Sequence, residues 1–175
     1  MKSLNKTFFF DRDGIVNVLL DGYVRFYNEF IFTDEFFQIY KKIIDAGYLT
    51  IVITNQQGIG KGLMNNEELE IVHQKMNEDI LKNCGKTFDD IFYCGSLHSD
   101  NSPRRKPNPG MLFEAIEKHN VDICKSFMIG DSLRDAQAAK AAGVKSILIG
   151  DYNSSDADYL YPNLKKFLED ISLFI

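Results

Sequence analysis

Short apolar runs alternate with amphipathic segments along the chain, and this alternation constrains the fold more than any other feature. The apolar runs predict five strands, at residues 7–10, 49–53, 91–93, 127–129 and 146–149. Apolar residues are mostly continuous within each run, which is typical of parallel strands that helices cover on both faces. The intervening segments predict helices at residues 34–46, 65–82, 111–119, 133–142 and 163–171. The sequence therefore predicts an α/β fold with a parallel sheet and right-handed crossovers.

Length, charge and cysteine content narrow the class of protein further. The chain has 175 residues, which fits one domain over 1–175, and no repeat, linker or low-complexity tract divides it. Its net charge of −5 argues against a nucleic-acid partner, because such proteins usually carry a basic face. Cys84, Cys94 and Cys124 are too widely spaced to indicate a disulfide framework. No signal-peptide pattern and no run of about 18 apolar residues is present, so we expect a cytoplasmic protein without membrane partners. We also expect a monomer.

Carboxylates follow the first and the fourth predicted strands. Asp11 and Asp13 lie one residue apart just before Gly14, and Asp131 and Asp135 follow the fourth strand. Taken alone, Asp11 and Asp13 are explained as well by an ordinary turn as by a functional role. Asp131 could be a helix N-cap, and Asp135 an acid that the helix dipole favours in the first turn. Ligands of parallel α/β sheets bind beyond the carboxyl ends of the strands. We therefore expect the carboxylates from these two segments to meet at one edge of the sheet.

A hydroxyl, an amide and a basic cluster follow the second and third strands. Thr54 and Asn55 precede the glycine-rich segment 56–62, whose backbone N–H groups can face an anion. A flexible connection is the plainer interpretation, whereas a dinucleotide fingerprint or a Walker A loop needs a different spacing. Arg105 and Lys106 belong to a basic run, and such runs are usually solvated surface segments without a further role. Two prolines stiffen this run, which is useful if Lys106 must be held at a fixed point.

Taken together, these segments resemble the four motifs of the haloacid dehalogenase (HAD) superfamily of phosphatases. The matching segments are residues 8–14, 54–55, 106–107 and 130–131. Within the superfamily the chain is similar to the D,D-heptose 1,7-bisphosphate phosphatases and the histidinol-phosphate phosphatases. Segments 21–24, 54–62 and 105–111 look nearer the heptose group. The resemblance implies a single Rossmann-like domain with helices on both faces of the sheet and no full cap domain.

The same resemblance implies a Mg²⁺-dependent phosphatase that works through an aspartyl-phosphate intermediate. Asp11 would be the nucleophile and Asp13 the general acid and base, while Thr54 and Lys106 would stabilise the transferred phosphoryl group. The implied Mg²⁺ ligands are Asp11, Asp131 and the backbone carbonyl of Asp13. The residues expected to bind substrate are Asp21, Gly22, Tyr23, Asn55, Gln56, Gln57 and Arg105.

One segment departs from the family pattern. The related groups usually carry a zinc loop before the third motif, built from three cysteines and a histidine. The corresponding places here hold Cys94, Ser96, Ser102 and Arg104, and His98 is out of step. Because a tetrahedral zinc site needs four good ligands, we expect no zinc.

A small sugar phosphate is the expected substrate, with D-glycero-D-manno-heptose 1,7-bisphosphate as the named candidate for 7-phosphate removal. Histidinol phosphate, another small metabolite or a nucleic-acid 3′ end remain alternatives, of which the acidic charge disfavours the last. A non-catalytic phosphate-binding regulatory protein would keep the same fold, and a NAD-binding protein would bind a dinucleotide. Segments 18–32 and 95–104 are expected to border an open pocket. Asp135 is a candidate for orienting Lys106 or a metal-bound water.

Overall fold

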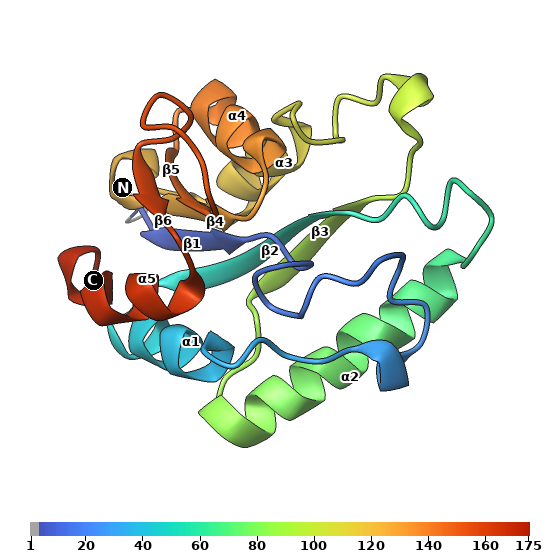
Figure 1. Ribbon diagram of the computed structural model, residues 1–175, viewed down its shortest axis with the longest axis horizontal. Coiled ribbons are helices and arrows are strands. Elements are labelled where there is room, and N and C mark those ends of the chain that lie inside the picture. Colours follow the sequence, from blue (N-terminus) through green and yellow to red (C-terminus); the bar gives the residue numbers. More distant parts are fainter. Residues whose placement is uncertain (1–3) are drawn as a thin grey trace.

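The computed structural model describes residues 4–175, which are built around a six-stranded sheet with parallel neighbours throughout (Figure 1). The strands are β1 (Thr7–Phe10), β2 (Leu49–Asn55), β3 (Asp90–Cys94), β4 (Phe127–Gly130), β5 (Lys145–Ile149) and β6 (Tyr159–Tyr161). Their order across the sheet is β3-β2-β1-β4-β5-β6. The order therefore reverses between β1 and β4, which is where ligands bind in open parallel sheets.

Helices cover both faces of this sheet. They are α1 (Phe36–Asp45), α2 (Asn66–Cys84), α3 (Gly110–His119), α4 (Leu133–Ala142) and α5 (Leu164–Asp170). Helices α1, α2 and α5 lie on one face, and α3 and α4 lie on the other (Figure 1). Side chains alternate between the faces of a strand, so Phe8 and Phe10 enter the first core and Phe9 enters the second. This two-sided burial explains the continuous apolar run in the sequence.

Local capping signals fix the starts of α2 and α4. At α2 the side chain of Asn65 accepts from the backbone N–H of Glu68, and the Glu68 carboxylate accepts from the N–H of Asn65. This reciprocal pair is the capping box that the sequence predicts. At α4 the N–H and the hydroxyl of Ser132 both donate to Asp135, at 3.0 and 2.9 Å. The start of α4 therefore fixes the position of the Asp135 carboxylate.

The predicted fold class is confirmed, and every predicted strand and helix is present within a residue or two of its expected ends. Strand β6 is an additional strand that the sequence does not predict, because its three residues are too few to give a recognisable apolar run. The last predicted helix is also shorter, since a 3-10 turn over Ile171–Leu173 follows α5. None of the helices within residues 4–175 is both long enough and apolar enough to cross a membrane.

Candidate active site

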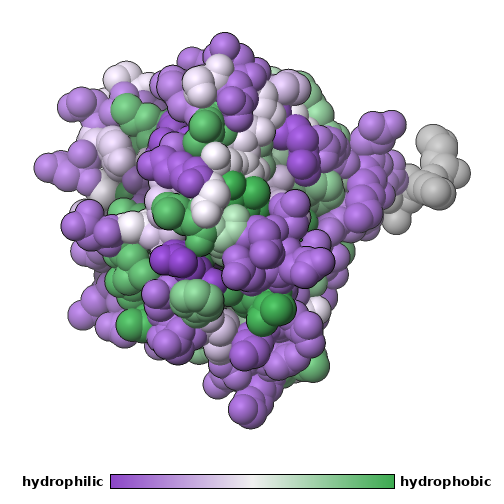
Figure 2. All heavy atoms as spheres, turned by 90° about the vertical axis from the view of Figure 1, so that its right-hand side faces the viewer, coloured by the Kyte–Doolittle hydropathy of each residue, from purple (hydrophilic) through white to green (hydrophobic). Residues whose placement is uncertain are grey.

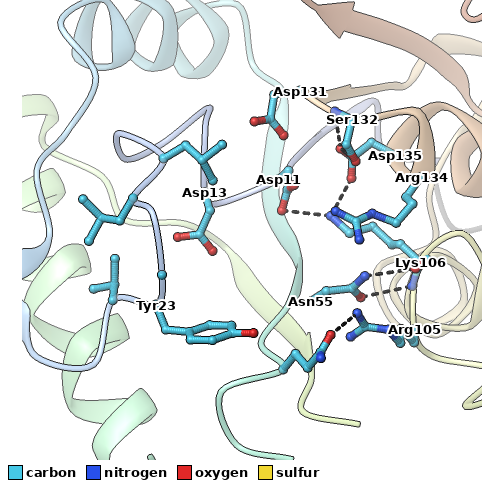
Figure 3. A pocket seen from close by; sticks show the side chains of 15 residues that line it. Asp11, Asp13, Tyr23, Asn55, Arg105, Lys106, Asp131, Ser132, Arg134 and Asp135 are labelled. Carbon is cyan, nitrogen blue, oxygen red and sulfur yellow. Dashed lines mark hydrogen bonds and ion pairs between the residues drawn. The ribbon is translucent and has the colours of Figure 1, made fainter. Parts of the chain in front are cut away.

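A cavity of about 330 Å³ opens at the carboxyl ends of the central strands. Its walls come from the segments that follow β1, β2 and β4 and from the segment that precedes α3 (Figure 3). Figure 2 views the molecule from this side, where the surface is mostly hydrophilic with apolar side chains among the polar ones. Leu19, Leu20 and Val24 give the cavity an apolar portion, whereas its floor is charged.

Lys106 lies between two carboxylates at the floor of the cavity (Figure 3). Its Nζ atom is 2.8 Å from Asp11 Oδ1 and 2.6 Å from Asp135 Oδ1, and it donates to the carbonyl of Ile53 at 2.7 Å. The Lys106 side chain is only 3% exposed. Burial disfavours its charge, but the two carboxylates outweigh burial and raise the pKa of Lys106. A fixed positive charge therefore lies directly beside Asp11.

Residues at the end of β2 hold this arrangement in place. Asn55 exchanges two hydrogen bonds with the backbone of Lys106, each 3.0 Å long. Gln56 Nε2 donates to Asp13 Oδ2 at 2.8 Å and to Thr54 Oγ1 at 2.9 Å. Asn55 lines the cavity, whereas Thr54 and Gln56 are buried and are not among the lining residues. The amides of Asn55 and Gln56 thus position Lys106 and Asp13 at the floor of the cavity.

Asp13 lies in a dense hydrogen-bond network. Arg12 Nη2 donates to both of its oxygens at 2.9 and 3.1 Å, and Asn17 and Gln56 add further bonds. Burial alone raises the pKa of Asp13, but the Arg12 charge and these hydrogen bonds outweigh it and leave that pKa below its usual value. Arg12 is fully buried, and its Nη1 lies 3.3 Å from His73 Nε2. Arginine only donates, so His73 accepts this bond, and burial with the Arg12 charge lowers the pKa of His73 to about 3.

Three carboxylates at the floor lie close enough to share a cation. Ligand atoms of Asp11, Asp131 and Asp135 all lie within 4.8 Å of one another. Burial, followed by the negative charge of Asp135, raises the pKa of Asp11 to about 8 and that of Asp131 to about 6. Gly14 makes the close approach of Asp131 possible, since a Cβ there would lie 2.0 Å from Asp131 Oδ2. A site in which the negative charges disfavour one another is suited to a divalent cation.

The predicted substrate-binding residues differ in their relation to the cavity. Those that line it are Gly22, Tyr23, Asn55, Gln57 and Arg105. Arg105 is buried, and its guanidinium donates to Gln57 Oε1 at 2.6 Å and to the carbonyl of Ser96 at 3.0 Å. The Tyr23 hydroxyl points into the cavity (Figure 3). Asp21 is exposed and is not among the lining residues, so a contact with substrate is not evident for this side chain.

The loop at residues 95–104 lies beside the cavity rather than in its wall. The Cys94 thiol donates to Ser102 Oγ at 3.7 Å, and Arg104 Nε donates to Glu114 Oε1 at 2.8 Å. His98 is exposed. The side chains of Cys94, Ser102 and Arg104 thus bond to other protein groups. The absence of zinc from this loop stays a prediction.

Two polar lining residues are not singled out by the sequence motifs. Ser132 and Arg134 both lie at the start of α4 and face the cavity (Figure 3). Ser132 reads as an ordinary helix cap in the sequence. Arg134 carries a weak signal, because a cation in the first turn of a helix opposes the helix dipole.

Comparisons with known proteins assign the family. A sequence profile described as HAD-hydrolase-like matches residues 103–172. The D-glycero-β-D-manno-heptose-1,7-bisphosphate 7-phosphatase of Helicobacter pylori (strain ATCC 700392 / 26695) is 34% identical over 169 residues, which cover 97% of each chain. The D-glycero-α-D-manno-heptose-1,7-bisphosphate 7-phosphatase of Burkholderia mallei is 34% identical over 152 residues, which cover 83% of this chain and 79% of the relative.

A solved structure shows the same fold. The D,D-heptose 1,7-bisphosphate phosphatase from B. bronchiseptica, crystallised with magnesium and phosphate, superposes with a TM-score of 0.85 at 29% identity. The match covers 96% of this chain and 98% of the relative. The resemblance read from the four motifs is thereby confirmed. The chain belongs to the HAD superfamily and is a phosphatase of the family that includes these relatives.

Proposed function

We propose that this phosphatase removes the 7-phosphate of D-glycero-D-manno-heptose 1,7-bisphosphate with Mg²⁺ as its cofactor. The observation that carries the proposal is the arrangement at the cavity floor. Asp11 lies beside the buried ammonium group of Lys106, and it is close enough to Asp131 for both carboxylates to bind one cation. A nucleophilic carboxylate, a fixed cation and a metal position are the groups that phosphoryl transfer requires. The heptose bisphosphate named for the relatives supports the choice of substrate.

The oxygen donors at the floor fit Mg²⁺. Asp11 and Asp131 would supply carboxylate ligands and Asp13 its backbone carbonyl, which leaves positions for the waters that Mg²⁺ usually keeps. Asp135 belongs to the same cluster but pairs with Lys106 at 2.6 Å, so we assign it to orienting that lysine. When bound, the ion supplies positive charge that offsets the repulsion between Asp11 and an anionic phosphate. The magnesium in the B. bronchiseptica relative supports this assignment.

In the first step, an oxygen of Asp11 attacks the phosphorus atom of the 7-phosphate. The bond from phosphorus to the sugar oxygen breaks, and Asp13 gives that oxygen a proton. Lys106 stays beside the phosphoryl oxygens and stabilises their charge in the transition state. Thr54 is proposed as a further hydrogen-bond donor to the phosphoryl oxygens. Its hydroxyl oxygen accepts from Gln56, so the hydroxyl proton remains available to donate. The products are the aspartyl-phosphate and the free 7-hydroxyl group.

In the second step, Asp13 takes a proton from a water molecule, which attacks phosphorus and displaces Asp11. The lowered pKa of Asp13 keeps it ionised at neutral pH, as a base must be. A bound phosphate brings further negative charge and so raises the pKa of the neighbouring carboxyl group. The acid role of Asp13 in the first step therefore falls in the complex with substrate, and its base role follows the departure of the sugar.

A substrate panel tests the proposal. Phosphate release is measured for both anomers of the heptose 1,7-bisphosphate, for heptose 7-phosphate, for histidinol phosphate and for a 3′-phosphorylated oligonucleotide. Each assay is run with Mg²⁺ and with a chelator. We expect the highest kcat/KM for the heptose bisphosphate and no turnover with the chelator. A higher value for histidinol phosphate or the oligonucleotide would refute the substrate, and turnover in the chelator would refute the cofactor.

The Asp11→Asn variant tests the nucleophile. It keeps the size of the side chain but removes the attacking carboxylate, so we expect turnover to fall by at least about a thousandfold. Asp45→Asn is the matched control, because Asp45 is exposed at the end of α1, away from the cavity. Full activity in Asp11→Asn would contradict the aspartyl-phosphate. A non-catalytic phosphate-binding protein would instead bind phosphate and turn over nothing even in the wild type.

A further inference from the structure

The cavity contains one arginine that the proposed reaction does not use. Arg134 lines the cavity and its side chain is exposed. No residue within 4–175 forms a hydrogen bond or an ion pair with its guanidinium. The other two lining cations differ in this respect, since Lys106 pairs with Asp11 and Arg105 donates to Gln57 and Ser96. Arg134 is thus the lining cation whose hydrogen-bond donors remain available to a ligand.

The place of Arg134 in its helix is unfavourable for a cation. Ser132 is the N-cap of α4, so Arg134 lies at the second helical position. The helix dipole there favours negative charge and disfavours positive charge. Asp135, one residue later, meets that preference, whereas Arg134 opposes it. An anionic ligand in the cavity would offset this cost and would fill the unused donors of Arg134.

Arg134 lies nearer the mouth of the cavity than the residues at which the phosphate is proposed to react. The side chains of Lys106 and Asp11 are 3% and 13% exposed and form the floor, whereas Arg134 is exposed at the rim. Figure 3 shows Arg134 on the same side of the cavity as Lys106 and Arg105. A substrate whose reacting phosphate lies against Asp11 presents its remaining groups toward the rim. Arg134 therefore faces a part of the substrate that does not react.

We propose that Arg134 binds the phosphate that is not hydrolysed and so gives the enzyme its preference for a bisphosphate over a monophosphate. This inference rests on the proposed function. A guanidinium fork matches two phosphate oxygens at once. Arg105 contributes to the same positive side, because its donors meet only the neutral oxygens of Gln57 and Ser96 and leave its charge uncompensated. No bond is made or broken at Arg134, which contacts substrate as a specificity residue.

Two substrates that share one ring test the inference. We compare kcat/KM for heptose 1,7-bisphosphate with kcat/KM for heptose 7-phosphate in the wild type, Arg134→Gln and Arg134→Lys. Arg134→Gln should lower the bisphosphate value about tenfold or more, the size expected for one lost charged hydrogen bond, and should change the monophosphate value less than about threefold. Arg134→Lys should recover part of the loss. Lys140→Gln is the control, since Lys140 is a cation of the same helix outside the cavity.

Direct binding provides a second measurement. The product heptose 1-phosphate keeps the phosphate that we assign to Arg134, so its dissociation constant, measured by calorimetry with Mg²⁺, should rise by a similar factor in Arg134→Gln. Equal losses with both substrates would overturn the inference by placing Arg134 on the reacting phosphate, and unchanged values would overturn it by showing no contact. If the wild type hydrolyses neither substrate, the proposed function fails. The titration still decides the inference in that case, since unchanged affinity in Arg134→Gln would overturn it and weakened affinity would support it.

Discussion

Replacing Gly14 with alanine tests whether Asp131 is a metal ligand. Gly14 has a φ of +89°, and a Cβ at this position would lie 2.0 Å from Oδ2 and 2.4 Å from Cγ of Asp131. Non-bonded heavy atoms essentially never lie within 3.0 Å of a Cβ atom, so the Asp131 carboxylate has to move away by about 1 Å. Metal–ligand distances hold to within about 0.2 Å. Gly14→Ala therefore removes Asp131 from the proposed Mg²⁺ position without changing its chemistry.

Two separate costs are expected, and a matched variant separates them. The left-handed backbone costs an L residue about 1–2 kcal/mol of stability. Displacement of the carboxylate should raise the Mg²⁺ concentration for half-maximal activity by about tenfold to a hundredfold, the range seen for disturbed metal sites. Gly47→Ala carries only the first cost, because Gly47 has a φ of +78° and nothing lies within 4 Å of its added Cβ.

Denaturant titration without Mg²⁺ and Mg²⁺ titration of phosphate release are the two assays. The free energy of unfolding should fall by a similar amount in both variants, because both carry the backbone cost. Only Gly14→Ala should shift the Mg²⁺ dependence. If folded Gly14→Ala needs no more Mg²⁺ than Gly47→Ala, then Asp131 does not hold the ion and the metal assignment is wrong.

Two further predictions concern the buried network and the pH dependence of stability. His73→Leu removes the acceptor of a fully buried Arg12 donor, so the free energy of unfolding should fall by about 1–3 kcal/mol in denaturant titration. His73→Gln keeps an acceptor, so its free energy of unfolding should fall less. Equal decreases in the two variants would contradict this account. Without Mg²⁺, stability should fall as pH rises from 6.5 toward 8, because the pKa of Asp11 is raised from 3.8 to about 8 and the native state binds more protons than the unfolded chain. The depressed pKa of His73 acts only below its unfolded value of 6.5, where it favours stability at higher pH. A thermal midpoint that rises between pH 6.5 and 8 in metal-free protein would contradict the Asp11 assignment.

Features that depend on local pattern and topology are predictable from the sequence. The continuous run Phe8, Phe9 and Phe10 predicts a strand buried on both faces, and the structure divides these rings between two cores. The meeting of Asp11 and Asp131 is also predictable, because both follow parallel strands and the carboxyl ends of such strands share one edge. The register between β1 and β4 then sets the short separation of the two carboxylates.

Features that depend on side-chain packing between distant elements are not predictable in this way. His73 reads as a structural helical residue, yet α2 brings its ring against Arg12, and thereby into the network around Asp13. Nothing local in the sequence indicates this contact, since sixty-one positions separate the two residues. Arg134 is similar, because only the tertiary structure shows that its rim position faces the same cavity as Lys106.

Asp11 and Asp13, the two carboxylates of the first motif, have pKa values shifted in opposite directions, although only one residue separates them. Of the two carboxylates, only Asp13 accepts from the Arg12 guanidinium, which together with Asn17 and Gln56 lowers the pKa of that carboxyl. Burial and the nearby charge of Asp135 outweigh Lys106 at Asp11 and raise its pKa to about 8. Environments that push paired carboxyl pKa values apart are how sites assign nucleophilic and acid–base roles. Asp11 therefore needs an added cation to be fully ionised at neutral pH, whereas Asp13 does not, so we expect the metal dependence of the proposed reaction to originate at Asp11.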